Sequence, residues 1–210
     1  MTGHFITIEG GEGAGKSTQL RLLADWLHQR GIAVTTTREP GGSLGAEAIR
    51  KLLVEGAIDR WDAMTEALLH FAARRDHLTK TVWPALQRGE WVISDRFADS
   101  TMAYQGYGHG LGRSAIERLY AVAVGDFKPD LTLILDIPVE FGLQRALARS
   151  GAETRYEKMD VQFHHRLRHG FLEIAHGEPN RCKLIDAQGS LEQVQDKIRE
   201  AISAILGVRP

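Results

Sequence analysis

Residues 10–17 read Gly-Gly-Glu-Gly-Ala-Gly-Lys-Ser, and this stretch decides the fold because it matches the complete phosphate-binding pattern G-x-x-x-x-G-K-[ST]. It follows an apolar run, Phe5-Ile6-Thr7-Ile8, that is typical of a buried strand, and it precedes an amphipathic stretch at residues 20–27. A glycine-rich turn that merely joins a strand to a helix does not require this spacing. The sequence therefore predicts a strand, a phosphate-binding loop and a helix in succession.

The residue types of this loop follow from what a phosphate group requires. Its glycines allow turns that a side chain would forbid, so that successive N–H groups surround an anion at the start of a helix. Lys16 would bring its ammonium to the outer phosphates, and the Ser17 hydroxyl would bind Mg²⁺. We expect nucleotide phosphates to lie against the whole loop, which consists of Gly10, Gly11, Glu12, Gly13, Ala14, Gly15, Lys16, Ser17 and Thr18.

Length and composition limit the class of protein. A chain of 210 residues suffices for one α/β domain with a sizeable core, and we expect residues 1–210 to form a single domain. The formal net charge of −1 speaks against a nucleic acid polymer as partner. The start of the chain does not have the pattern of a signal peptide, no apolar run has the length of a membrane span, and Cys182 is the single cysteine. These features predict a cytoplasmic protein without a membrane partner, in which Cys182 is a small buried hydrophobe.

Further strand patterns alternate with helical ones along the chain. Strands are expected at residues 33–37, 91–94, 131–136 and 182–186, in addition to the one before the loop. Helical periodicity runs from residue 62 to about residue 88, and other helical patterns lie between the later strands. Five strands that alternate with helices predict a parallel sheet covered on both faces, as in the P-loop NTPase fold.

Charged residues stand where two of these strands end. Arg38 follows the strand at 33–37, and Asp95 and Arg96 follow the strand at 91–94. Ligands of α/β proteins bind at the carboxyl ends of the strands, so we expect both arginines to face a ligand. Asp95 fits two roles, a magnesium ligand or the N-cap of the segment after it, and the two are compatible.

One polar segment interrupts the α/β pattern. Residues 148–158 are charged and poor in core residues, between a helix that ends near Leu147 and one that begins near Asp160. Such a segment is usually a solvated connection. Phosphoryl transfer, however, uses mobile segments with arginines that close over the phosphates. We interpret residues 148–158 as a catalytic lid that carries Arg149 and Arg155.

The order of these motifs resembles that of the bacterial thymidylate kinases. The matching segments are 10–18, 37–42, 71–74, 95–97, 100–101 and 103–106. The resemblance extends from about residue 5 to about residue 200. It implies transfer of the γ-phosphoryl group of ATP to dTMP, with Mg²⁺ as cofactor, in a homodimer.

The family's residue roles carry over by position. The resemblance assigns Arg38 and Arg96 to the acceptor phosphate, Arg74, Thr101 and Gln105 to thymine, Tyr104 to the 2′ side of the sugar, and Glu12 to its 3′ hydroxyl. It assigns catalysis to Lys16, Asp95, Arg96, Arg149 and Arg155, and Mg²⁺ to Ser17 and Asp95.

Two departures from the family pattern affect this assignment. Many relatives have an aromatic residue that stacks on thymine four residues before the base-reading arginine, whereas this chain has His70 there and Phe71 one residue later. Phe71 is our first choice for stacking and His70 our second. Gly13 stands where some members have a catalytic arginine. The resemblance therefore assigns that role to the lid, with Arg155 as the first choice and Arg149 as the second.

Three rival functions are considered. Another nucleoside monophosphate kinase would differ in the residues around Arg74 that bind the acceptor. A GTPase switch needs the guanine-reading motif Asn-Lys-x-Asp, but the only asparagine, Asn180, is followed by arginine. A non-catalytic nucleotide sensor would be expected to lose Lys16 or the lid arginines, and this chain has all of them.

Overall fold

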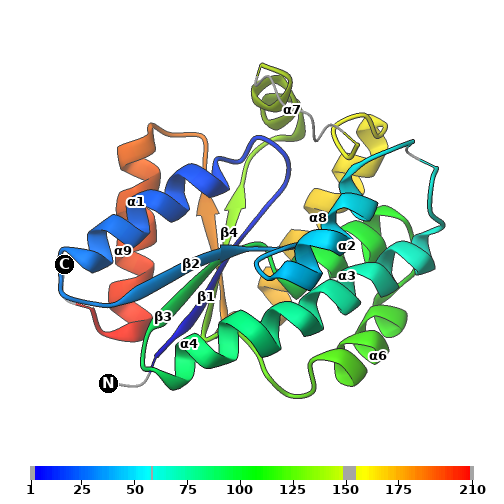
Figure 1. Cartoon of the computed structure of the whole chain (residues 1–210). Helices are drawn as coiled ribbons and strands as arrows, with labels where there is room; N and C mark the ends of the chain where they lie inside the picture. Colours follow the sequence, from blue (N-terminus) through cyan, green and yellow to red (C-terminus); the bar gives the residue numbers. More distant parts are fainter. Residues whose placement is uncertain (1–2, 58, 149–154, 209–210) are drawn as a thin grey trace.

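The computed structural model describes residues 3–57, 59–148 and 155–208, which fold around one parallel sheet (Figure 1). Its strands are β1 (Phe5–Glu9), β2 (Val34–Arg38), β3 (Trp91–Asp95), β4 (Leu131–Asp136) and β5 (Cys182–Asp186). They lie in the order β2-β3-β1-β4-β5, and every neighbouring pair is parallel. The five strands predicted from the sequence are confirmed, with ends that agree to within one residue.

Helices cover both faces of this sheet. They are α1 (Lys16–His28), α2 (Leu44–Val54), α3 (Ala63–His77), η1 (Leu78–Val82), α4 (Trp83–Gln87), α5 (Ala98–Thr101), η2 (Met102–Gly108), α6 (Arg113–Ala123), α7 (Val139–Leu147), α8 (Val161–Gly177) and α9 (Leu191–Leu206). In Figure 1, α1 and α9 lie on one face, and α3, α6 and α8 lie on the other. The α/β architecture expected from the sequence is confirmed.

The helical pattern at 62–88 is a run of three helical elements. Asp62 caps α3, accepting hydrogen bonds from the amides of Met64 and Thr65. The run widens into the π-helical turn η1 and continues as α4, which has Pro84 in its first turn. Proline has no amide hydrogen and its ring crowds the preceding turn, so a wider turn before Pro84 accommodates it.

The core consists of two apolar clusters, one on each side of the sheet. Ile6 and Ile8 of β1 point into the cluster under α1 and α9, whereas Phe5 points into the cluster under α3 and α8. This alternation follows from the two-residue period of a strand. Full burial of such a side chain contributes about 1.5–3 kcal/mol to stability. Because both faces are buried, the strands read as nearly continuous apolar runs, which made them recognisable in the sequence.

One smaller expectation is also met. Cys182 is buried at the start of β5, and burial, followed by the nearby Asp99 charge, raises the pKa of its thiol to about 12, so it is not a nucleophile at neutral pH. Among the described residues, no helix combines the length and the apolar character that a bilayer crossing demands.

Candidate active site

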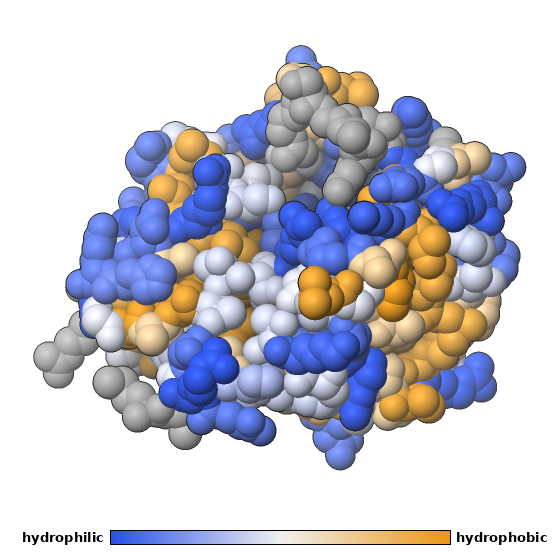
Figure 2. Space-filling model, viewed as in Figure 1, coloured by the Kyte–Doolittle hydropathy of each residue, from blue (hydrophilic) through white to orange (hydrophobic). Residues whose placement is uncertain are grey.

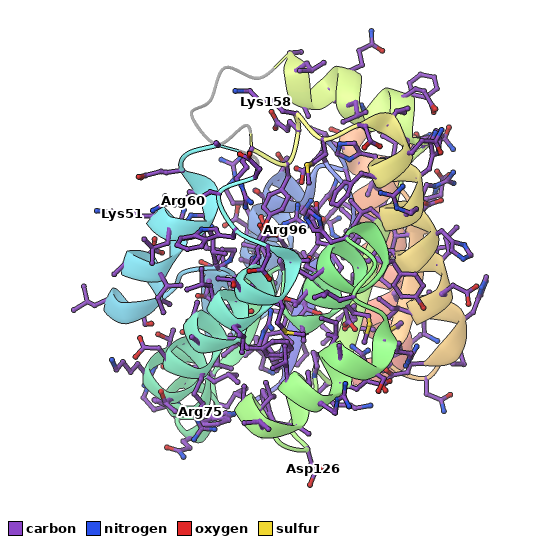
Figure 3. All side chains as sticks on the ribbon, turned by 90° about the vertical axis from the view of Figure 1, so that its right-hand side faces the viewer. Lys51, Arg60, Arg75, Arg96, Asp126 and Lys158 are labelled. Carbon is purple, nitrogen blue, oxygen red and sulfur yellow. The ribbon has the colours of Figure 1, made fainter. Side chains whose placement is uncertain are left out.

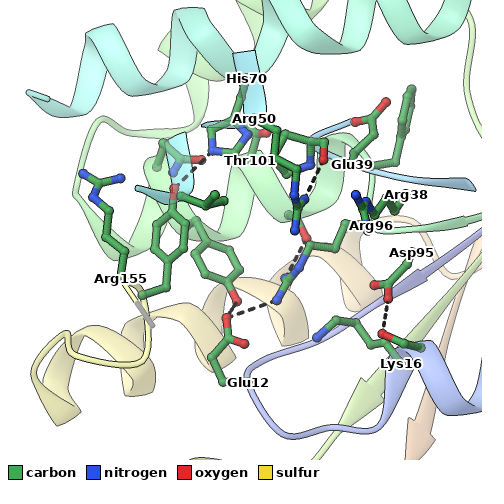
Figure 4. A pocket seen from close by; sticks show the side chains of 18 of the residues that line it. Glu12, Lys16, Arg38, Glu39, Arg50, His70, Asp95, Arg96, Thr101 and Arg155 are labelled. Atoms are coloured by element: carbon green, nitrogen blue, oxygen red, sulfur yellow. Dashed lines mark hydrogen bonds and ion pairs between the residues drawn. The ribbon is translucent and has the colours of Figure 1, made fainter. Parts of the chain in front are cut away.

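A cavity of about 630 Å³ opens at the carboxyl ends of β1, β2 and β3 (Figure 4). Its walls come from the phosphate-binding loop, the ends of β2 and β3, the helices α2, α3, α5 and η2, and residues 155–157. The predicted site residues that line it are Glu12, Gly13, Gly15, Lys16, Ser17, Arg38, His70, Arg74, Asp95, Arg96, Thr101, Tyr104, Gln105 and Arg155. Parallel strands end at the same edge of a sheet, so residues far apart in sequence meet here.

The phosphate-binding loop has the backbone that its glycines predict. Gly10, Gly13 and Gly15 have φ angles of 135°, 70° and 91°. A Cβ atom at Gly13 would lie 1.9 Å from the carbonyl oxygen of Gly142, so an arginine could not occupy this position without a shift of the backbone. Ala14 packs into the core beneath the loop. At position 13 the loop therefore brings backbone, and no arginine, to the cavity.

Lys16 is positioned to bind an anion. Its ammonium donates to the carbonyl oxygens of Gly10 and Gly11, at 3.0 and 2.8 Å. Burial, and next the nearby Arg96 charge, lower the pKa of Lys16 to about 8. A bound phosphate would supply the missing counter-charge, so the lysine is suited to a polyphosphate ligand.

Ser17 and Asp95 meet across the cavity, as a shared magnesium site requires. The Ser17 hydroxyl donates to Oδ2 of Asp95 at 2.6 Å. Asp95 caps no helix: Phe97 occupies the N-cap position of α5, and no side chain accepts a hydrogen bond there. One carboxylate and one hydroxyl fit Mg²⁺, which keeps several waters and takes its remaining ligands from substrate phosphates. The described residues contain no group of three or more His, Cys, Asp or Glu side chains arranged to hold a metal by themselves.

Arg96 joins the phosphate-binding loop to the wall of the cavity. It has a φ of 72°, an uncommon value for a residue with a side chain, and its side chain is 17% exposed; Figure 3 labels its position. Its guanidinium donates to the Gly10 carbonyl (3.2 Å), to the Ser100 hydroxyl (3.1 Å) and to Oε1 of Glu12 (3.1 Å). It also lies 4.8 Å from the centre of the Tyr104 ring. Strained backbone at a cavity is typical of a functional residue.

Glu12 accepts two hydrogen bonds at this point. Besides the bond from Arg96, its Oε1 accepts one from the Tyr104 hydroxyl at 2.5 Å. Burial by itself raises the pKa of Glu12, but the charges of Arg96 and Lys16 outweigh it and hold the pKa at about 2. Glu12 is therefore ionised, and it holds Tyr104 and Arg96 in place.

Buried Glu9, at the end of β1, fixes the segment that carries Arg96. It accepts from the Phe97 amide at 2.7 Å and from the Ser100 hydroxyl at 2.5 Å. Burial, followed by the charge of Asp99, raises the pKa of Glu9 to about 8. Glu9 was not predicted as a site residue, because it lies between the predicted strand Phe5-Ile6-Thr7-Ile8 and the phosphate-binding loop at residues 10–17.

Arg74 is the largest side chain among those that are almost fully buried. Its Nε donates to Glu39 at 2.8 Å and its Nη2 to the Thr101 hydroxyl at 3.0 Å, while Nη1 has no partner among the described residues. The rings of Phe71 and Phe97 lie 4.8 and 5.1 Å from its guanidinium. A buried, unpaired N–H on a cavity wall is a donor available to a ligand.

The first choice of stacking residue is wrong. Phe71 is buried in the core, packs edge-on against Tyr120, and is absent from the cavity wall. His70 lines the cavity instead, with Nε2 3.2 Å from the Tyr156 hydroxyl. Burial, ahead of all charge effects, lowers the pKa of His70 to about 4, so its ring is neutral near pH 7. The four-residue spacing to Arg74 was a usable signal, because residues i and i+4 share one helix face.

Arg155, interpreted from the sequence as a catalytic lid arginine, has a buried side chain in the structure. Arg155 is 5% exposed. It is paired with the Glu66 carboxylate, and it donates to the carbonyl oxygens of Leu53 (3.1 Å) and Ala57 (3.2 Å). In the structure Arg155 is thus a buried part of the cavity wall, and its predicted action on the phosphates stays a prediction. Arg149 and most of the predicted lid lie outside the described residues.

Sequence reasoning missed several residues of this cavity. One of them is Arg50, which lines the cavity and donates to the Pro40 carbonyl at 2.6 Å. Arg38, which was predicted, also lines the cavity, and its side chain is half exposed beside Glu47. Tyr156, also a wall residue, donates to buried Glu66, which does not line the cavity itself. Glu39 pairs with Arg74, and its position directly after Arg38 was the available signal. Arg50 lies on a helix and Tyr156 within the predicted lid, and no pattern in the sequence distinguished either from its neighbours.

The chain is similar throughout to thymidylate kinases. The family model described as "Thymidylate kinase" matches residues 8–198. The Thymidylate kinase of Caulobacter vibrioides is 56% identical over 98% of this chain and 99% of its own length. That of Rhizorhabdus wittichii is 51% identical over 98% of this chain and 100% of its own. A crystal structure of thymidylate kinase from Ehrlichia chaffeensis, 35% identical, superposes with a TM-score of 0.81 over 96% of this chain and 100% of that one.

Proposed function

Because this chain belongs to the thymidylate kinase family, and is thus an ATP-dependent phosphotransferase that converts dTMP to dTDP, we propose that the cavity binds dTMP with its base against Arg74 and Gln105. The observation that carries this proposal is a pair of buried polar atoms without partners among the described residues. They are Nη1 of Arg74, a donor, and Oε1 of Gln105, an acceptor. Thymine presents the complement at one edge, an O4 acceptor beside an N3–H donor.

The remaining base contacts follow from the walls of the cavity. Neutral His70 faces the cavity and would stack on the thymine ring without adding a charge. Thr101 holds Arg74 through Nη2 and so keeps Nη1 directed at the base. A planar base needs a stacking surface and a few fixed hydrogen-bond partners to be distinguished from its relatives, and these residues supply both.

At the other end of the nucleotide, Arg38, Arg50 and Arg96 would surround the acceptor phosphate, since all three line the cavity. Glu12 would lie at the 3′ hydroxyl of the sugar. Tyr104, held by Glu12, would close the 2′ side and favour a deoxyribose. The ATP phosphates would lie at the other side of Glu12, against the phosphate-binding loop.

The reaction we propose is direct in-line transfer. Lys16 and the loop amides hold the ATP phosphates, while Arg96 bridges loop and acceptor site and so aligns the two substrates. Ser17 and Asp95 would hold Mg²⁺, which, when bound, neutralises phosphate charge. No covalent enzyme intermediate is needed, because the approximation of two bound substrates is a sufficient source of rate. Arg155 acts on the acceptor site through Glu66 and not on the phosphates.

An assay of ADP release with ATP and a panel of nucleoside monophosphates tests the function. We expect kcat/KM for dTMP to exceed that for dCMP, AMP and GMP by orders of magnitude, because cytosine presents an amino donor and a ring acceptor to Arg74 and Gln105, the reverse of what they match. A preference for a monophosphate other than dTMP would support the rival nucleoside monophosphate kinase reading. No ADP release with any acceptor would support a nucleotide sensor.

We propose in addition that the protein is a cytoplasmic homodimer that pairs through α3 and α6. These neighbouring helices expose Met64, Leu68 and Val122, with 38%, 50% and 87% of their surfaces accessible, and Figure 2 shows apolar surface on this side of the molecule. A self-complementary apolar patch suits a two-fold dimer. Fractionation of cells tests the location.

Light scattering tests the dimer. The wild-type protein is expected at twice the chain mass, and Leu68→Glu at the mass of one chain, because a charge in an apolar interface is costly to desolvate. Leu147→Glu is the matched control, since Leu147 is exposed on α7, away from this patch, and its variant should remain dimeric. A monomeric wild type, or dissociation by Leu147→Glu as well, would contradict the proposed interface.

A further inference from the structure

Glu66 is a buried carboxylate to which no role in reading the base has been assigned above. It lies on α3 at four-residue intervals from His70 and Arg74, so all three share one face of the helix. Glu66 is 1% exposed. Its Oε1 accepts from Nε2 of Gln105 at 2.7 Å and from the Tyr156 hydroxyl at 2.9 Å, and its Oε2 is paired with Arg155.

The charge of Glu66 restricts what its partners can do. Burial by itself raises the pKa of Glu66, but contacts with His109, His70 and Arg155 outweigh burial and lower the pKa to about 2. The carboxylate is therefore ionised near neutral pH, and an ionised carboxylate can only accept hydrogen bonds. Any group that bonds to it must present a donor.

The charge of Glu66 affects the base site by orienting the side-chain amide of Gln105. A glutamine amide has an NH₂ donor at one end and an oxygen acceptor at the other. Since Glu66 binds the NH₂ end, Oε1 of Gln105 faces away from Glu66, is buried, and has no partner among the described residues. If the amide rotated by half a turn, two oxygens would oppose each other in a buried place, which is strongly unfavourable.

We propose that Glu66 is a positioning residue that sets the base specificity of the acceptor site by fixing which end of the Gln105 amide meets the base. This inference rests on the proposed binding of dTMP in the cavity. With Glu66 ionised, Gln105 offers an acceptor to N3–H of thymine, next to the donor that Arg74 offers to O4. Cytosine has a lone pair at N3, so the same amide orientation rejects it.

Glu66→Gln tests this inference, because it keeps the shape of the side chain and removes the charge. A neutral amide can donate as well as accept, so Gln105 is free to turn its NH₂ toward the base. We expect kcat/KM for dTMP to fall about 10- to 100-fold, the range for a misplaced buried hydrogen bond, mainly through KM for dTMP. The ratio of kcat/KM for dTMP to that for dCMP should fall at least as strongly, whereas KM for ATP should not change.

A double-mutant cycle shows whether Glu66 acts through Gln105. Gln105→Leu alone should lower the dTMP to dCMP ratio, and adding Glu66→Gln to it should lower the ratio no further. Arg155→Met removes the ion-pair partner of Oε2 of Glu66 but leaves the carboxylate, Tyr156 and Gln105 in place. It should therefore change the ratio much less than Glu66→Gln does.

Glu178→Gln serves as the matched control. Glu178 is likewise paired with an arginine, Arg181, and with a lysine, Lys128, but at a distance from the cavity. Its variant should retain the wild-type ratio, and thermal melts of every variant report folding. An unchanged ratio in folded Glu66→Gln, an effect of Arg155→Met equal to that of Glu66→Gln, or additive effects in the cycle would overturn the inference.

Two further outcomes keep the test decisive. If Glu66→Gln does not fold, Gln105→Leu still tests the inference. An unchanged ratio of kcat/KM for dTMP to that for dCMP in this variant would show that Gln105 does not recognise the base, and the inference would fail. If the wild-type enzyme itself does not prefer dTMP, the proposed function fails before the role of Glu66 is reached. If the wild-type enzyme prefers dTMP and Glu66→Gln keeps that preference, the proposed role of Glu66 is contradicted while the proposed function stands.

Discussion

Lys16→Met is expected to lower kcat/KM for ATP by about 10²–10³-fold, the range observed when one preorganised charge or donor at a reacting group is removed. The phosphate-binding loop positions the ammonium group of Lys16, which donates to the carbonyl oxygens of Gly10 and Gly11. Methionine keeps the length of the side chain but not its charge. Steady-state kinetics with varied ATP measure the loss, and Lys80→Met, at an exposed lysine paired with Asp76, should leave the kinetics unchanged.

The pH dependence of the wild-type enzyme gives this prediction a second readout. Burial, followed by the charge of Arg96, lowers the pKa of Lys16 to about 8 in the free protein. As the pH rises through that value, Lys16 loses its proton and its attraction for phosphate, so kcat/KM for ATP should decline above about pH 8. Lys16→Arg keeps the charge and should move this decline to higher pH. A decline that stays in place in Lys16→Arg would show that another group titrates.

Arg74→Met is expected to lower kcat/KM for dTMP by about 10²-fold or more, while KM for ATP changes little. The variant removes the only donor we assign to thymine O4. It also leaves Glu39 buried, with the His77 ring as its remaining side-chain hydrogen-bond partner among the described residues. Breaking a buried ion pair by removal of one partner destabilises a protein by about 3–5 kcal/mol, so a lower melting temperature is expected as well.

A second variant separates these two effects. Arg74→Met combined with Glu39→Gln removes both charges and should recover part of the lost stability. It should not recover the use of dTMP, because the donor for O4 is still missing. If dTMP use returned together with stability, Arg74 would be a structural residue and not a reader of the base. A loss of ATP affinity in the single variant would equally contradict the assignment.

Much of the fold could be predicted from the chain alone. The apolar runs at Phe5-Ile6-Thr7-Ile8 and at residues 91–94 are buried on both faces of the sheet, and such strands have a strong local pattern. The loop at residues 10–17 carries its own geometry, because its glycines are the residues that permit positive φ angles. Lys16, Ser17 and Asp95 could be placed together for the same reason, since each directly follows a recognisable strand or lies in the loop.

Other parts of the site could not be predicted in this way. The pairing of Glu66 with Arg155 joins residues 89 positions apart, and neither stands in a pattern that marks it. Whether His70 or Phe71 faced the cavity depended on how α3 is rotated against the sheet, and packing of Phe71 in the core settled that rotation. Arg155 looked like a lid residue because its neighbours in the sequence are polar, yet its own side chain is buried.

The sequence by itself therefore determined the phosphate-binding loop, the order of strands and helices, and the family to which the chain belongs. These features depend on residues close together in the chain, where periodicity and glycine spacing act directly. Only the tertiary structure decided which side of α3 meets the cavity, how Arg155 is held, and which end of Gln105 faces a base. Those choices depend on which buried donor meets which buried acceptor, and only the folded chain brings such groups together.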